Sequence, residues 1–260
     1  MSNVTVVTAL YNIQRETNGD GRKWSDYLSW FEQTLKLPLN MMIFVPSELV
    51  SFVNSHRPTH YRTQIIQQEL TDIPYASLAP AIAALFATPS YQSKIKHPKR
   101  VECKLPFYNI LQYSKFKWLT HAVTSNPFQS EYFFWMDAGI SRFIHTQATP
   151  VPTIRLPPNK LTIQHNHALT YYPIHEQYLW DSQCLMCGTM FGGDKTAITT
   201  IATEIDQQLT TRLANQWINN EQILLAYIYK NKPEWFNPVL NNTPKHLMLY
   251  DHCFLRDSNP

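Results

Sequence analysis

Glycine, sulfur and charge are all sparse in this chain of 260 residues. Its six glycines include no G-x-G-x-x-G string, which excludes the fingerprint of a dinucleotide-binding fold. Charged residues make up 16% of the chain and the net charge is +3, so no nucleic-acid partner is expected. No apolar run reaches the roughly 18 residues of a membrane span. These absences leave a globular protein that acts on small molecules or other macromolecules.

The four cysteines are Cys103, Cys184, Cys187 and Cys253. The first residues, MSNVTVVTALYN, lack the basic region and the cleavage site of a signal peptide, so we expect a cytoplasmic chain with reduced thiols. The spacing of Cys184 and Cys187 matches half of a zinc site, but the other two cysteines would have to converge on it. Buried thiols are the simpler interpretation.

Hydrophobic residues are plentiful at 44%, aromatic residues reach 13%, and 18 prolines predict stiff loops. Residues 4–10 and 41–45 are apolar runs typical of buried strands, and residues 25–35 and 47–55 have helical spacing. This alternation predicts an α/β fold with a mostly parallel, twisted sheet flanked by helices.

The remaining pattern extends the same fold. We predict helices and strands at residues 79–87 (helix), 107–124 (helix), 132–136 (strand), 161–167 (strand), 185–191 (strand), 196–213 (helix), 223–229 (buried helix) and 247–250 (strand). Residues 57–106 are interrupted by prolines and predict little. There is no internal repeat or composition break, so residues 1–260 are interpreted as one domain.

The central feature is the aromatic run at residues 132–136, which ends on Asp137 and is followed by Ala138 and Gly139. A carboxylate at the carboxyl end of a buried strand lies where open α/β sheets bind ligands. It would suit a divalent metal that holds a diphosphate. The alternative is an aspartate that only caps the next turn.

Four other groups are candidates for binding. Arg15, in the loop after the first strand, and Lys115, on the helix 107–124, would contact phosphate oxygens, or else are ordinary surface cations. The basic residues between 94 and 104 predict at most peripheral contact with an anionic membrane, or a solvated loop. His165 and His167 would share one strand face as a metal pair, or as two exposed histidines.

Candidate catalytic carboxylates lie in the second half of the chain. Glu221 opens the buried helix 223–229 and would serve as a sugar-facing anion or as a helix cap. Asp181 and Asp194 are the reserves. Gly192 and Gly193 allow close approach of a sugar or form a tight turn, and Asp194 is expected to cap the helix that follows. Gln222 is a further candidate for the sugar or acceptor pocket.

Several strings together resemble the HtrL/YibB family of bacterial proteins. They are residues 6–11 (VVTALY), 27–31 (YLSWF), 126–128 (NPF) and 132–139 (YFFWMDAG). The resemblance implies a single glycosyltransferase-like domain of the GT-A type that binds a nucleotide-sugar. It also implies that Thr8, Ala9, Tyr11 and Arg15 line the nucleotide pocket, and that Asp137 stands where such enzymes keep a metal-binding D-x-D motif.

The chain departs from that motif, because Gly139 replaces the second aspartate. The resemblance places His252 where GT-A enzymes take another metal ligand, with His246 in reserve, so Mn²⁺ or Mg²⁺ bound by Asp137 and His252 is expected. The cation would stabilise the charge that develops on the diphosphate. The implied partners are a UDP-sugar donor and a glycan or glycolipid acceptor, as in polysaccharide biosynthesis. The expected location is the cytoplasm or the cytoplasmic face of a membrane.

Two rival functions belong to other classes. One is a carbohydrate- or nucleotide-binding protein with a degenerate, inactive fold, which the missing second aspartate favours. The other is a metal-dependent phosphodiesterase or nucleotidyltransferase that uses His165, His167 and Asp137.

Overall fold

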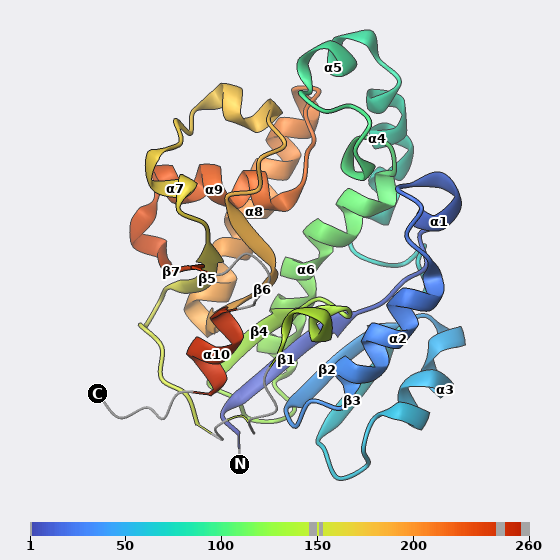
Figure 1. Cartoon of the computed structure of the whole chain (residues 1–260), viewed down its shortest axis with the longest axis vertical. Coiled ribbons are helices and arrows are strands. Elements are labelled where there is room, and N and C mark those ends of the chain that lie inside the picture. The colour runs from blue at the N-terminus through green and yellow to red at the C-terminus, as the bar shows by residue number, and fades with distance from the viewer. Residues whose placement is uncertain (1, 146–149, 151–152, 243–247, 256–260) are drawn as a thin grey trace.

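The computed structural model describes residues 2–145, 150, 153–242 and 248–255, and it is built on one seven-stranded sheet (Figure 1). The strand order is β3-β2-β1-β4-β6-β5-β7. The strands are β1 (Val4–Ala9), β2 (Asn40–Val45), β3 (Thr63–Gln67), β4 (Tyr132–Met136), β5 (Leu161–His165), β6 (Met186–Asp194) and β7 (Phe236–Leu240).

The sheet is mixed but mostly parallel. Strand β1 is parallel to β2 and β4, β2 to β3, and β5 to β7, whereas β6 is antiparallel to both neighbours. The predicted fold class is therefore confirmed. The chain adds β2 and β3 on one side of β1 and β4 on the other, so the carboxyl ends of β1 and β4 meet at a switch point of the topology. Open α/β sheets bind ligands at such a point.

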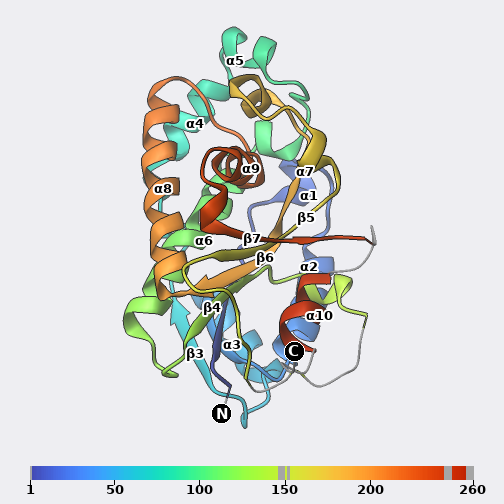
Figure 2. The same ribbon diagram turned by 90° about the vertical axis from the view of Figure 1, so that its left-hand side faces the viewer.

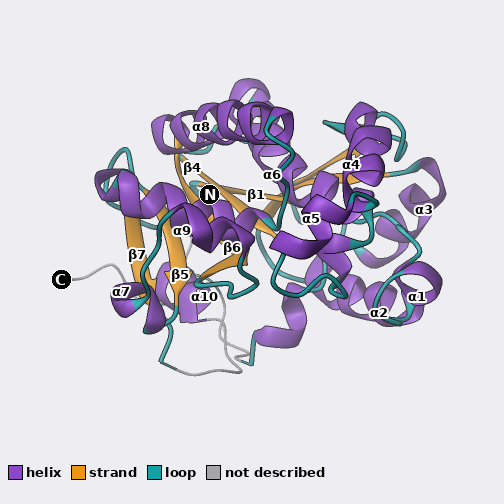
Figure 3. Ribbon diagram, turned by 90° about the horizontal axis from the view of Figure 1, so that it is seen from above, coloured by secondary structure: helices purple, strands orange, loops and turns teal. Residues whose placement is uncertain are grey.

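Helices cover both faces of the sheet. They are α1 (Arg15–Asn18), α2 (Trp24–Leu35), α3 (Ser47–His56), α4 (Ala79–Phe86), α5 (Pro89–Lys94), α6 (Pro106–Ser125), α7 (Ala168–Tyr171), α8 (Lys195–Ala214), α9 (Glu221–Asn231) and α10 (Met248–Phe254), with short 3₁₀ turns η1 (Ala76–Leu78), η2 (Val101–Cys103), η3 (Ile140–Phe143), η4 (Glu176–Trp180) and η5 (Pro233–Trp235). Helices α6 and α8 lie on one face, and α2 and α10 lie on the other (Figures 2 and 3).

Strand β4 shows why an unbroken apolar run is needed at the centre. Phe133 and Trp135 pack into the core under α6 and α8, whereas Phe134 and Met136 pack into the core under α2 and α10. Side chains alternate between the two faces of a strand, so both faces of β4 must be apolar. Met136 is the last residue of β4, and Asp137 follows directly at the carboxyl end of the strand.

One predicted strand is wrong, and two predicted strands are present but end at other residues. Residues 248–250 belong to helix α10, because Leu249, Tyr250, Cys253 and Phe254 are buried at helical spacing; residue 247 lies outside the described residues. Strand β5 ends at His165, and His167 lies at the position just before the short helix α7, so the two histidines do not share a strand face.

The third correction concerns β6. It does not end at residue 191 but continues through Asp194, and Gly192 lies opposite Phe134 in β4. A Cβ at Gly192 would lie 2.4 Å from the Phe134 ring, which explains the glycine as a packing requirement. Strands β3 and β7 were missed, since β3 is only partly buried and β7 contains Pro238. No helix in the described ranges is both long and apolar enough to cross a membrane.

Candidate functional site

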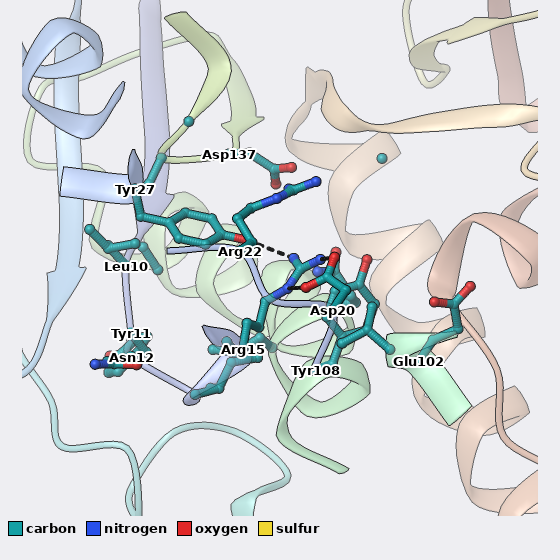
Figure 4. A pocket seen from close by; sticks show the side chains of 18 of the residues that line it. Leu10, Tyr11, Asn12, Arg15, Asp20, Arg22, Tyr27, Glu102, Tyr108 and Asp137 are labelled. Atoms are coloured by element: carbon teal, nitrogen blue, oxygen red, sulfur yellow. Dashed lines mark hydrogen bonds and ion pairs between the residues drawn. The ribbon is translucent and has the colours of Figure 1, made fainter. Parts of the chain in front are cut away.

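A cavity of about 810 Å³ opens at the carboxyl ends of β1 and β4, at the switch point of the sheet. Its walls come from the loop that follows β1, the turn at residues 137–139 after β4, helix α6, and the loop around Lys99 and Arg100. Figure 4 shows Arg15, Asp20, Arg22, Tyr27 and Asp137 around this space. A volume in this range suits a ligand as large as a nucleotide-sugar.

A buried ionic network forms the floor of the cavity. Lys115 is almost fully buried, and its Nζ lies 2.9 Å from Glu221 Oε1, 3.1 Å from Asp137 Oδ1 and 2.9 Å from the Gly188 carbonyl oxygen. Gly188 is required there, because a Cβ would lie 2.1 Å from Glu221 Oε1. The Trp135 indole N–H also donates to Asp137 Oδ1, at 2.7 Å.

The carboxylates of this network have different roles. Glu221 is fully buried and does not line the cavity, whereas the Asp137 side chain is 31% exposed and does line it. Burial raises the pKa of Glu221, although Lys115 opposes the shift. Burial would lower the pKa of Lys115, but the charges of Asp137 and Glu221 outweigh it and raise that pKa. The lysine therefore stays charged and presents Asp137 to the cavity as a fixed group.

Arg15 lines the cavity as predicted, but its guanidinium is already occupied. Its Nε donates to Asp20 Oδ1 at 3.0 Å and its Nη2 forms an ion pair with Asp20 Oδ2 at 2.5 Å. Its Nη1 donates to the Tyr27 hydroxyl at 2.6 Å, and the guanidinium stacks over Tyr108. Arg15 therefore holds the loop between β1 and α2 in shape.

Helix α2 is attached directly to the turn that carries Asp137. The Thr34 hydroxyl donates to the Ala138 carbonyl oxygen at 2.7 Å, and the Ser141 hydroxyl donates to the Trp30 carbonyl oxygen at 2.9 Å. A Cβ on Gly139 would lie 3.2 Å from Cε3 of Trp30, tighter than most contacts of this kind. Gly139 therefore lets the Trp30 ring pack against the turn.

Two further arginines point to the cavity from this region. The guanidinium carbon of Arg142 lies 4.6 Å from the centre of the Trp30 ring, and that of Arg22 lies 5.9 Å from it. Both residues line the cavity. Sequence reasoning missed them, although both flank the strings at residues 27–31 and 132–139. The position of Arg142 just after the turn at residues 137–139 was the signal that could have identified it.

The residues beside Asp137 do not fit a divalent cation. Its Oδ1 already accepts hydrogen bonds from an ammonium and an indole, and Gly139 leaves little room for a second carboxylate. Within the described residues no group of three His, Cys, Asp or Glu side chains could hold a metal. His252 lies on α10 and does not line the cavity, and His246 lies outside the described residues. Mn²⁺ or Mg²⁺ bound by Asp137 and His252 stays a prediction, and the contacts of Asp137 do not favour it.

The structure brings together about half of the predicted site. Ala9, Tyr11, Arg15, Lys115, Asp137, Ala138, Gly139 and Gln222 all line the cavity. Gln222 Oε1 accepts a hydrogen bond from the Gly188 N–H at 3.0 Å. Thr8 is fully buried in β1 and does not line it. Tyr11 presents only an edge, since it is 5% exposed and its ring stacks on Trp118.

The other predicted residues lie elsewhere. Asp194 caps α8 by accepting the Ala197 N–H, and it pairs with Tyr132 at the start of β4, the end of the strand away from Asp137. Gly192 and Gly193 are neighbours of Asp194 in β6. Asp181 forms an ion pair with Lys96, 3.0 Å away, and also accepts from the Tyr172 hydroxyl.

The histidines and cysteines are also dispersed. His165 Nδ1 is bonded to the Asn166 carbonyl oxygen, and neither His165 nor His167 lines the cavity. The four cysteines are free thiols, as predicted. Burial raises the pKa of Cys184 to about 12, so this thiol stays protonated and is a poor metal ligand.

Comparison with known proteins gives a matching family and similar solved structures. The sequence matches, over residues 2–244, a family described as bacterial protein of unknown function (HtrL_YibB). No curated protein matches the chain significantly. The fold is similar to the apo form of mouse xyloside xylosyltransferase 1, with a TM-score of 0.41 and 10% sequence identity, over 92% of this chain and 84% of that chain. Because the family match spans nearly the whole chain, the protein belongs to the HtrL/YibB family.

Proposed function

We propose that this protein is a glycosyltransferase that binds a nucleotide-diphosphate sugar, such as a UDP-sugar, in the cavity between β1 and β4. The observation that carries the proposal is the cavity itself. It lies at the topological switch point, and it combines aromatic walls, unpaired arginines and one fixed carboxylate. The arginines suit an anionic ligand, and the exposed carboxylate suits sugar hydroxyls.

The reaction would move a sugar from the diphosphate to an acceptor hydroxyl. A bond forms between the hydroxyl oxygen and the anomeric carbon, and the bond from that carbon to the diphosphate oxygen breaks. Its electron pair stays on the diphosphate, and the hydroxyl proton passes to a base. The GT-A type of domain that the family resemblance implies agrees with this chemistry. The acceptor would be a glycan or glycolipid that approaches the open side of the cavity.

Asp137 is the candidate to contact the reacting sugar. It follows the central strand, lines the cavity, and keeps Oδ2 available while Lys115 and Trp135 hold Oδ1. Asp137 would therefore stabilise the positive charge that grows on the sugar, or accept the hydroxyl proton.

Glu221 is assigned a different role from a general base. It is fully buried beneath the cavity and pairs with Lys115, so an acceptor hydroxyl would not reach it. We infer that Glu221 positions Lys115, which in turn positions Asp137. Asp181 and Asp194, which do not line the cavity, are proposed to act outside the chemical step.

A thermal-shift panel tests donor binding. A ligand that binds the folded state but not the unfolded state raises the melting temperature. At a ligand concentration a hundredfold above Kd, the free energy of unfolding rises by about 2.7 kcal/mol. We expect at least one nucleotide-diphosphate sugar to raise Tm, and the matching free sugar to leave it unchanged. If every nucleotide-sugar leaves Tm unchanged at millimolar concentration, the proposed function is wrong.

A further inference from the structure

Three of the six cations that line the cavity already have anionic partners. Arg15 pairs with Asp20, Arg100 pairs with Glu102 at 2.7 Å, and Lys115 pairs with Asp137 and Glu221. Arg22 and Arg142 differ, because neither forms a hydrogen bond or an ion pair with any residue that the structure describes. Two arginines without partners in one cavity are typical of a site for an external anion.

Trp30 holds these two arginines near each other. Both guanidinium groups contact its ring. Each also has a second aromatic neighbour: the guanidinium carbon of Arg142 lies 4.6 Å from the centre of the Phe143 ring, and that of Arg22 lies 5.9 Å from the centre of the Tyr27 ring. Stacking on aromatic rings fixes a guanidinium plane without using its N–H donors. The donors therefore stay available to a ligand.

The arrangement is unfavourable without a ligand. Burial lowers the pKa of Arg142, and the nearby charge of Arg22 lowers it further, although the charge of Asp137 opposes the shift. The Nε of Arg142 is buried without a hydrogen-bond partner among the described residues. A buried donor without a partner and two like charges side by side both cost free energy. An anion between the two arginines would remove both costs.

The position of this pair relates it to the missing carboxylate. In the D-x-D pattern a second carboxylate would stand at residue 139. Here the backbone of Gly139 packs against the Trp30 ring, with a hypothetical Cβ 3.2 Å from it. The Trp30 ring, which both arginines contact, thus occupies the space that a metal-binding side chain at residue 139 would need.

We propose that Arg22 and Arg142 form the diphosphate subsite of this cavity, and that they neutralise the leaving diphosphate in place of a divalent metal ion. Planar guanidinium groups bind phosphate oxygens in a bidentate manner, and a diphosphate offers each arginine its own phosphate group. The negative charge that develops on the leaving group is then stabilised by fixed charges of the protein. This inference rests on the proposed function.

Calorimetric titration of UDP, GDP and dTDP tests it, first in EDTA and then with Mn²⁺. The variants are Arg22→Ala and Arg142→Gln, and the control is Arg155→Ala, which removes an exposed arginine that does not line the cavity. We expect at least one nucleoside diphosphate to bind wild type in EDTA. Each cavity variant should weaken binding by about tenfold or more, and the control should not.

The outcomes separate this inference from the proposed function. Binding that requires Mn²⁺, or that survives unchanged in both cavity variants, overturns the arginine subsite and leaves a nucleotide-binding transferase. Absence of binding by all three nucleotides in both EDTA and Mn²⁺ overturns the proposed function as well. Arg22 lies in the loop before α2 and is half-buried, so the Arg22→Ala protein should fold. Its nucleotide affinity therefore tests the arginine subsite even if the Arg142→Gln protein fails to fold.

Discussion

Lys115 controls the charge balance at the bottom of the cavity. Its ammonium is buried between two carboxylates, and it stays charged only because both are near. A buried ion pair contributes little net stability when complete, but loss of one partner leaves a costly charge. The network is therefore better understood as a device that fixes Asp137 than as a source of stability.

This view predicts the effect of Glu221→Gln. The change keeps the size of the side chain but removes the negative charge that is most deeply buried beside Lys115. We expect unfolding free energy to fall by roughly 3–5 kcal/mol, with donor affinity only slightly changed. Chemical denaturation and a donor titration measure the two quantities.

Glu204→Gln is the matched control. Glu204 pairs with Lys232 at 2.7 Å, but that lysine is partly exposed, so the loss should be about 1 kcal/mol or less. A Glu221→Gln protein of normal stability whose turnover drops by about a hundredfold would instead make Glu221 the base.

At the scale of elements, helix α2 and the turn after β4 act as one unit. Thr34 and Ser141 join them by hydrogen bonds, and Gly139 brings the backbone against Trp30. The backbone of Gly139 has φ −93° and ψ 22°, which other residues also adopt. The requirement for glycine here is therefore the contact with Trp30 and not a special conformation.

Substitution at residue 139 tests that unit. Gly139→Ala adds only the Cβ and should destabilise the fold by about 1–3 kcal/mol through overpacking. Gly139→Asp restores the D-x-D pattern, but we expect no gain of Mn²⁺ binding and weaker nucleotide binding, because Trp30 and its two arginines must move. Calorimetry with Mn²⁺ and with UDP measures both. Micromolar Mn²⁺ binding by the aspartate variant, absent from the alanine variant, would contradict this account.

The elements that sequence reasoning predicted are those whose hydrophobic period is unambiguous. Strands β1, β2 and β4 are continuous apolar runs, and α6 has a long apolar stripe. Strand β3 was missed because it is partly buried and polar. Helix α10 was mistaken for a strand, since a run of four apolar or aromatic residues carries no clear period.

The site was predictable where it depends on strand ends. Asp137 follows directly from the end of a buried strand, whereas Ala9 was predicted only through the family resemblance. Lys115 and Glu221 are 106 positions apart in the chain, so no local sequence pattern predicts that they pair. The arginine pair was missed for the same reason, because Trp30 connects Arg22 and Arg142 only in three dimensions.

At the scale of the whole molecule, the sheet topology determines where chemistry can take place. The reversal of strand order beside β1 creates a crevice, and both cores end just below it. Glu221, Lys115 and the two arginines come from four separate segments that meet only there. From the basic stretch at residues 94–104, Lys99 and Arg100 line this cavity.

The central claim is that this cavity transfers sugar from a nucleotide-diphosphate donor through Asp137. The most direct measurement is analysis of the products formed from a panel of nucleotide-sugars, by chromatography, with wild type and Asp137→Asn. We predict release of nucleoside diphosphate from at least one donor, at a rate that Asp137→Asn lowers by about a hundredfold or more. Release of sugar phosphate with nucleoside monophosphate, or equal rates in the two proteins, would contradict the account.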